Sequence, residues 1–213
     1  MSMILLLLIG LNLLASFKGF NDLSFIRNYQ FHIGSIRAGE QYRMVTSGFL
    51  HADIGHLFFN MFTLYMFGPV VINYLNEFSF GLIYAGSLVF GSLLTLLFHK
   101  DDYHYSAIGA SGAVTGILYS AILLNPDMSL YLFFIPIPIP AYLFGIGYLL
   151  YSIYGMKAKN DNIGHTAHFG GAIGGYVLTL IKAPDLLTEH TFMVVLLAIP
   201  IVLLFVLVKT GKL

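Results

Sequence analysis

Long apolar segments recur along almost the whole chain, and shorter polar stretches separate them. A helix of roughly 17–25 apolar residues spans the hydrocarbon core of a bilayer, which is about 30 Å thick. The pattern therefore predicts seven membrane-spanning helices, near Met3–Phe17, Ile54–Tyr74, Phe78–Phe98, Ile108–Leu124, Ala141–Met156, Thr166–Ile181 and Thr191–Val208. Because most of the connections are short, neighbouring helices are expected to pack antiparallel.

Three segments need separate interpretation. The long connection from Lys18 to Asp53 carries basic and aromatic side chains, which predicts a folded element partly embedded at the membrane interface. In Ile135–Pro140, proline alternates with isoleucine and disfavours helix, so we expect a non-helical, interfacial approach to the fifth span. The opening run Met1–Phe17 lacks a basic start and a convincing cleavage site, which favours a retained span over a signal peptide.

Composition supports an all-α polytopic membrane protein. Of the 213 residues, 58% are hydrophobic and 9% are charged, whereas a soluble domain carries about 25% charged residues. A chain this apolar needs the bilayer as the solvent for much of its surface. The sequence contains no internal repeat or low-complexity region, and we expect a single membrane-embedded domain over residues 1–213.

Charge and residue content exclude several functions. Ten basic and ten acidic residues give a formal net charge of zero, which provides no basic surface for nucleic acid. The absence of cysteine excludes disulfides, thiolate metal sites and a cysteine nucleophile. His51 and His56 are five residues apart and form no His-Glu-x-x-His motif, so zinc hydrolysis lacks its ligands. We therefore expect no metal and no cofactor.

Ser111 is the first candidate for chemistry, because a polar residue is costly at membrane depth and is often functional there. It lies in Gly109-Ala110-Ser111-Gly112-Ala113, where Gly109 can relax the start of the helix so that the serine amide points free. The alternative is packing, because Gly112 and Gly116 form a small-xxx-small pair that is typical of close helix crossings. For the serine motif by itself, packing is the commoner explanation.

His168 makes catalysis a stronger explanation than packing alone. It precedes two interleaved glycine spacings, Gly170/Gly174 and Gly171/Gly175, which would let the sixth span approach the fourth closely. A close crossing is what a serine–histidine hydrogen bond of about 2.6–3.2 Å requires. The alternative is a histidine that bonds to a neighbouring carbonyl or reaches the interface from the helix end. The presence of both residues on glycine-lined helices favours nucleophilic catalysis.

A third pair lies at the start of the second span. His56 and Asn60 are four residues apart and share one helix face. An imidazole and an amide aimed at one point suit a developing oxyanion, although an ordinary hydrogen bond between helices is an equally simple explanation. The acidic residues all fall in loops or at span ends, so we expect a Ser-His dyad without a carboxylate. Their placement also disfavours catalysis by paired aspartates and a carboxylate proton relay.

Taken together, these motifs resemble those of rhomboid intramembrane serine proteases. His56-x-x-x-Asn60, Gly109-Ala110-Ser111-Gly112 and Ala167-His168-x-x-Gly171-x-x-x-Gly175 occur in the family's order, and the resemblance covers about Tyr42 to Ile181. It implies a rhomboid-like six-helix core over about residues 1–182 and a seventh, C-terminal span over about residues 190–208.

The resemblance also implies a role for each matching residue. Ser111 would be the nucleophile and His168 the general base and then acid, while His56, Asn60 and the Ser111 amide would form the oxyanion hole. Residues in supporting structural roles would be Tyr42 and Arg43, which resemble the family's Trp-Arg pair, the upstream histidine His51, and the glycines Gly109, Gly112, Gly171 and Gly175.

Two positions depart from the family's pattern. Four residues after the nucleophile the family often has an aromatic side chain, against which the histidine ring packs, and here that residue is Thr115. Four residues after Gly68 a glutamate is common, and here that residue is Ile72. Either change loosens the site or is covered by another residue, and neither removes a reacting group.

The expected function is cleavage of a peptide bond in or beside a transmembrane helix by the Ser-His dyad. The partners implied are transmembrane protein substrates and the lipid bilayer, with no nucleic acid, while the oligomeric state stays open. One alternative is a catalytically inactive rhomboid-like protein that binds membrane clients, although such relatives usually lack the serine or the histidine. A small transporter or channel is a third possibility, but the spans offer few ion-coordinating groups.

The charge distribution and the family resemblance imply opposite orientations of the protein in the membrane. Nine of the ten Lys and Arg residues fall on the side of the membrane opposite the N-terminus, and only Lys182 falls on the N-terminal side. The positive-inside rule therefore places the long first loop in the cytoplasm. The resemblance instead implies a bacterial plasma (inner) membrane protein with a cytoplasmic N-terminus and an active site that opens to the extracytoplasmic side.

Overall fold

The computed structural model describes residues 2–132, 135–158 and 163–213; Lys159 and Asp161, two of the loop charges counted above, lie outside the described residues. Each of the seven predicted spans forms a helix. These helices are α1 (Met3–Asn21), α5 (Ile54–Tyr74), α6 (Glu77–Phe98), α7 (Ser111–Leu124), α8 (Ala141–Ala158), α9 (His165–Lys182) and α11 (Thr191–Lys209). Within the described ranges, α1, α5, α6 and α11 are long and apolar enough to cross a membrane, and α7 is a shorter apolar helix. The prediction of an all-α fold is confirmed.

The long first connection is a folded unit, as predicted. It contains α2 (Leu23–Tyr29), β1 (Phe31–His32), α3 (Ile33–Arg37), α4 (Arg43–Thr46) and the 3-10 turn η1 (Ser47–Phe49). Strand β1 pairs antiparallel with β2 (Ser106–Ala107), which lies just before α7. Phe31, Ile33 and Ile36 form a small buried cluster beside this pair. The connection is thereby attached to the segment that leads into α7.

The remaining elements are short. Strand β3 (Ser129–Leu132) pairs antiparallel with β4 (Ile135–Pro140), and α10 (Leu186–Glu189) precedes α11. The proline-alternating segment is therefore not helical, as predicted, and it is paired as a strand. In this segment the pairing N–H groups come from the isoleucines, because proline has none.

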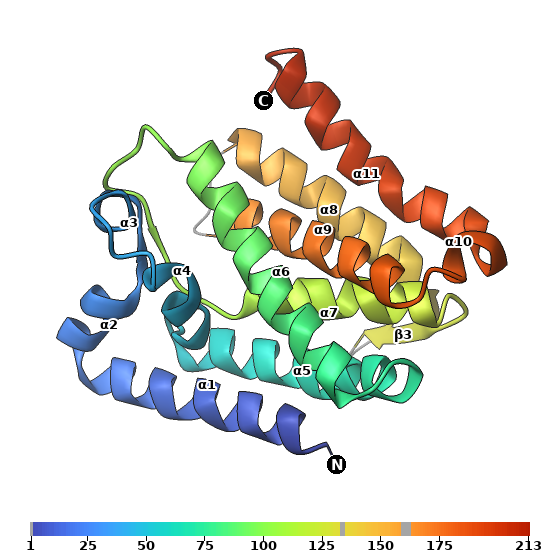
Figure 1. Ribbon diagram of the computed structural model, residues 1–213, viewed down its shortest axis with the longest axis horizontal. Helices are drawn as coiled ribbons and strands as arrows, with labels where there is room; N and C mark the ends of the chain where they lie inside the picture. The colour runs from blue at the N-terminus through green and yellow to red at the C-terminus, as the bar shows by residue number, and fades with distance from the viewer. Residues whose placement is uncertain (1, 133–134, 159–162) are drawn as a thin grey trace.

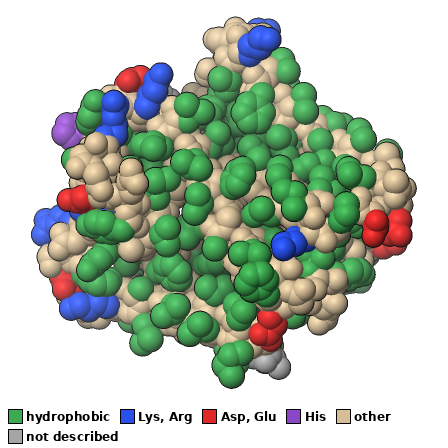
Figure 2. Space-filling model, viewed as in Figure 1, with side chains coloured by type: hydrophobic (Ala, Val, Ile, Leu, Met, Phe, Trp, Pro, Cys, Tyr) green, Lys and Arg blue, Asp and Glu red, His purple; other side chains and the backbone are tan. Residues whose placement is uncertain are grey.

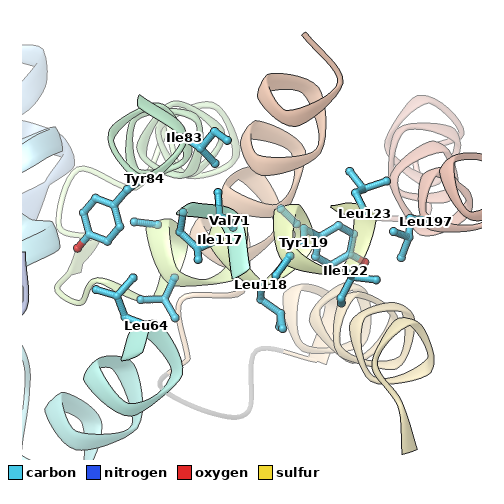
Figure 3. Close-up of a cluster of buried hydrophobic side chains, with 14 of the residues drawn as sticks. Leu64, Val71, Ile83, Tyr84, Ile117, Leu118, Tyr119, Ile122, Leu123 and Leu197 are labelled. Carbon is cyan, nitrogen blue, oxygen red and sulfur yellow. The ribbon is translucent and has the colours of Figure 1, made fainter. Parts of the chain in front are cut away.

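Helix α7 forms the centre of the bundle, because every residue from Gly112 to Leu124 is buried. Figure 1 shows α1 and α11 on opposite sides of the bundle, with α5 to α9 between them. Figure 3 shows side chains of α7 between those of α5, α6 and α11; the labelled residues are Leu64, Val71, Ile83, Tyr84, Ile117, Leu118, Tyr119, Ile122, Leu123 and Leu197. The Tyr119 hydroxyl donates a hydrogen bond to the Gly145 carbonyl at 2.9 Å, which ties α7 to α8.

The outer surface is apolar. Figure 2 shows hydrophobic side chains across the middle of one face and most charged side chains at its periphery. Large side chains on the outer helices are strongly exposed, including Met3 at 74%, Leu14 at 73% and Phe192 at 76%. Such a surface suits contact with lipid, in which helices satisfy their own backbone hydrogen bonds.

Helices α7 and α9 cross at glycines. A Cβ atom on Gly171 would overlap the carbonyl oxygen of Gly112, and one on Gly175 would overlap the carbonyl oxygen of Gly116. Both obstacles are backbone atoms, which cannot move aside as a flexible side chain can. Because glycine lacks a Cβ, the two helices approach until their backbones touch.

The other glycine pair faces a different helix. A Cβ on Gly170 would lie 2.5 Å from the Phe90 carbonyl oxygen, and one on Gly174 would lie 2.8 Å from the Ser87 Cα. The expectation that this pair helps α9 approach α7 is therefore wrong, because it lets α9 approach α6. The reason is rotation, since adjacent residues of a helix point about 100° apart.

Candidate active site

Gly109 determines where α7 begins. Its φ is +137°, a conformation that L side chains rarely adopt, and its N–H donates to the Ser47 carbonyl at 3.0 Å. The helix therefore starts at Ser111 and not at Ile108, where the apolar run predicted it. A Cβ on Gly109 would also lie 2.7 Å from the ring of His56. Glycine at this position both turns the chain and makes room for that ring.

The structure places Ser111 and His168 in direct contact. The His168 Nε2 lies 2.6 Å from the Ser111 Oγ, and His168 is 6% exposed. Ser111 is the first residue of α7 and His168 lies in the first turn of α9, so the glycine crossing of these helices lies directly behind the contact. This distance is within the range for transfer of a proton between a nucleophile and its base.

The opposite nitrogen of the same ring contacts a residue that sequence reasoning missed. The His168 Nδ1 lies 2.7 Å from the Tyr148 hydroxyl of α8, and the two rings stack with centroids 5.6 Å apart. The Thr115 hydroxyl donates to the Ser111 carbonyl at 2.7 Å. Tyr148 therefore packs on the histidine where the family often uses an aromatic at the Thr115 position. Helix α8 contains four tyrosines, and the sequence contains no signal that selects this one.

His56 and Asn60 lie on the same side of α5 and line one cavity together with Ser111 and His168. The cavity has a volume of about 850 Å³. The Asn60 side-chain amide donates to the His56 carbonyl at 2.9 Å. An amide nitrogen carries two N–H groups, so this bond uses one of them. The Asp53 side chain accepts from the His56 N–H at 2.8 Å and caps the start of α5.

His51 lies behind the cavity lining and is 1% exposed. Its Nε2 accepts the Ala110 N–H at 3.4 Å, and its Nδ1 lies 2.8 Å from the Ser16 hydroxyl of α1. Burial lowers the pKa of His51 to about 3, and the neighbouring His56 lowers it further while Asp53 opposes the shift. His51 is therefore neutral near pH 7, and it joins α1 to the residue before Ser111.

Tyr42 and Arg43 lie in the first connection, and neither lines the cavity. Arg43 is 6% exposed, and it pairs with Glu40 at 2.5 Å and donates to the Arg27 carbonyl at 2.7 Å. The Arg43 guanidinium lies 5.6 Å from the centre of the Tyr42 ring. These contacts hold the connection together.

Ile72, which stands where the family commonly has a glutamate, packs against the main core. Among the described residues, no group of three or more His, Asp or Glu side chains could hold a metal ion.

Comparison with known proteins shows the family to which this chain belongs. The Rhomboid domain family matches residues 38–185, which is more than half of the chain. The chain therefore belongs to the rhomboid family, and it is a multi-pass integral membrane protein. Rhomboids are in general intramembrane serine proteases, although some members are inactive.

Three curated relatives place the chain within this family. It is similar to "RHOMBOID-like protein 12, mitochondrial" of Arabidopsis thaliana, with 35% identity over 72% of this chain and 50% of that protein. It is also similar to "Putative rhomboid protease YdcA" of Bacillus subtilis (strain 168), with 31% identity over 67% of this chain and 68% of that protein. "Rhomboid protein 1, mitochondrial" of Saccharomyces cerevisiae is 29% identical over 62% of this chain and 39% of that protein. The chain thus matches about half or less of the two mitochondrial relatives.

Proposed function

We propose that this protein is an intramembrane serine endopeptidase that cleaves peptide bonds in or beside the transmembrane helices of membrane proteins. The observation that carries the proposal is the 2.6 Å contact between the Ser111 Oγ and the His168 Nε2. It lies at a cavity lined by residues of five of the helices that correspond to predicted spans, α5, α6, α7, α8 and α9. We treat the chain as one membrane-embedded domain, with a catalytic core over about residues 1–182 and α11 as an additional span.

In the first step His168 acts as the general base. Its Nε2 takes the proton of the Ser111 hydroxyl while the Ser111 Oγ forms a bond to the carbonyl carbon of the substrate. The tetrahedral intermediate then collapses and the C–N bond breaks. The imidazolium of His168 returns the proton to the leaving amine, and the acyl group remains on Ser111.

Donors around Ser111 can stabilise the oxyanion that forms during attack. We assign this role to the Ser111 N–H and to the side chains of His56 and Asn60, which line the same cavity. The Ser111 N–H belongs to the first turn of α7, where backbone donors lack partners inside the helix and the helix dipole favours negative charge. In enzymes that use such donors, each one contributes roughly 10²–10³-fold to kcat.

Hydrolysis of the bond between the acyl group and Ser111 requires a water molecule beside His168. A water molecule in the cavity gives a proton to the His168 Nε2 and attacks the acyl carbon, and the proton then returns to the Ser111 Oγ. The sequence of steps needs no metal and no cofactor. The cavity lies among helices that suit a bilayer, so the natural substrate is itself an apolar, membrane-spanning segment.

The substrate must unwind before it can be cut, because a peptide bond inside a helix is shielded by its neighbours. Glycine, proline or other weak helix formers near the cut favour this unwinding. The test is reconstitution in lipid vesicles with a panel of single-span reporter proteins, followed by mass spectrometry of the products. We expect a cut in or beside the spanning segment at a site with such residues. A folded protein that cleaves no member of the panel contradicts the proposal.

We also propose that the protein lies in a bacterial plasma membrane with the cavity opening to the extracytoplasmic side. The bacterial relative supports a bacterial membrane. The usual topology of the family supports the extracytoplasmic side, while the distribution of Lys and Arg favours the cytoplasmic side. Because the chain has no cysteine, a single cysteine at Tyr103, which is 50% exposed, can report the orientation. We expect an impermeant thiol reagent to label Tyr103→Cys from outside intact cells, and labelling only after lysis contradicts this.

A further inference from the structure

The side of the His168 ring that faces away from Ser111 is occupied by Tyr148. The Tyr148 hydroxyl lies 2.7 Å from the His168 Nδ1, while Ser111 lies 2.6 Å from the Nε2 of the same ring. The imidazole therefore lies between a candidate nucleophile and a phenol. We propose that Tyr148 is a positioning residue that holds His168 in the tautomer and orientation that Ser111 requires; this inference rests on the proposed function.

Tyr148 first affects the tautomer of His168. A neutral imidazole carries one proton, on either Nδ1 or Nε2. His168 can take the Ser111 proton only when Nε2 is bare, so the ring proton must then be on Nδ1. In that state the Nδ1–H donates to the Tyr148 oxygen. The phenol proton has a different acceptor in the Thr115 oxygen, because Tyr148 is also hydrogen-bonded to Thr115 and the Thr115 hydroxyl gives its own proton to the Ser111 carbonyl. The bond from Nδ1–H therefore stabilises the productive tautomer. The same bond persists when the ring becomes an imidazolium, because both nitrogens are then donors.

Tyr148 also restrains the orientation of the His168 ring. The Tyr148 ring stacks with two others, with its centroid 5.6 Å from that of His168 and 6.1 Å from that of Phe144. The interplanar angles are 26° and 7°, respectively. Phe144 and Tyr148 are four residues apart on α8 and share one face. The stack restrains rotation of the imidazole about its own axis, which keeps Nε2 directed at Ser111.

The chemistry of the membrane explains why a phenol suits this place. In soluble serine proteases a buried aspartate accepts the Nδ1–H bond. An ionised carboxylate is costly at membrane depth. A phenol oxygen accepts the same bond without a charge, and it stabilises the imidazolium less than a carboxylate would. Tyr148 therefore supplies the geometry of a third triad member with a smaller electrostatic effect.

The variant Tyr148→Phe tests the inference, because it keeps the ring and the stacking and removes only the hydroxyl. We expect kcat for a transmembrane reporter to fall by about tenfold to a hundredfold, less than the roughly 10⁴-fold effect of the orienting aspartate in soluble enzymes. KM and the midpoint of thermal unfolding should stay at their wild-type values. The matched control is Tyr154→Phe on the same helix, where the side chain is 60% exposed, and its kcat should be unchanged.

Two results overturn the inference. One is a kcat for Tyr148→Phe that equals or exceeds that of the control, since this means that the phenol does not favour the productive tautomer. The other is a fall in kcat that is matched by a loss of thermal stability, since this means that the hydroxyl serves folding alone. Failure of the proposed function gives a different result from either of these. In that case the folded wild-type protein itself cleaves no reporter, and the role assigned to Tyr148 fails as well.

Discussion

Replacing Ser111 with alanine is expected to lower the rate of reporter cleavage by about 10⁶-fold, and His168→Ala should have an effect of the same order. The reason is that the Ser111 Oγ and the His168 Nε2, 2.6 Å apart, act as one unit. The hydroxyl is a weak nucleophile until the imidazole accepts its proton. The double variant should therefore be no slower than either single variant. Initial rates in lipid vesicles, measured for all three variants at equal protein concentration, provide the check.

Ser120→Ala is the matched control for this series. Ser120 lies on the same helix, is 0% exposed, and accepts a hydrogen bond from the Thr179 hydroxyl at 2.7 Å. The substitution removes a buried hydroxyl from α7 and changes none of the residues that line the cavity. The Ser120→Ala protein should cleave at close to the wild-type rate. Cleavage by Ser111→Ala at the rate of this control would refute the assignment of the nucleophile.

The second large effect is expected from Gly171→Ala, although the residue takes no part in the reaction. The added Cβ would overlap the carbonyl oxygen of Gly112, the residue that follows Ser111. Because the obstacle is backbone, α9 must move away from α7 and carry His168 with it. A misplacement of about 1 Å can cost on the order of 10²-fold in rate. Overpacking of this kind also costs about 1–3 kcal/mol of stability.

Gly10→Ala is the control for this substitution. Gly10 lies in α1, and a Cβ there would meet no heavy atom within 4 Å. This variant should keep the wild-type kcat and thermal midpoint, while Gly171→Ala should lose about 10²-fold in kcat. A wild-type kcat for Gly171→Ala would mean that the spacing of α7 and α9 does not set the geometry between Ser111 and His168.

The helices could be predicted from the sequence because the bilayer imposes a length on each apolar run. The apolar pattern predicts the second span at Ile54–Tyr74, and α5 covers the same residues. The same pattern predicts that the fourth span starts at Ile108, three residues before α7 begins at Ser111. The apolar run does include Ile108, but the positive φ of Gly109 prevents the helix from starting there. Hydrophobicity therefore locates a helix well, and its first residue depends on backbone conformation.

The sequence did not show which face of each helix is turned toward which neighbouring helix. The sequence indicated that glycines on α9 permit a close crossing, yet Gly171 faces α7 while Gly170 faces α6. Tyr148 was missed for the same reason, because choosing one of four tyrosines on α8 requires knowing which face of that helix is turned toward His168. The departure at Thr115 indicated that an aromatic contact was absent from α7. It did not indicate which neighbouring helix would provide one.

The central claim is that Ser111 is activated by His168 inside a bundle of membrane helices. Covalent labelling by a fluorophosphonate tests this most directly, because the reagent forms a bond from phosphorus to an activated serine Oγ with loss of fluoride and needs no knowledge of the substrate. We predict a single adduct that mass spectrometry locates on Ser111, with no labelling of the Ser111→Ala or His168→Ala proteins. A folded wild-type protein that stays unlabelled, or one labelled equally well without His168, would contradict the claim.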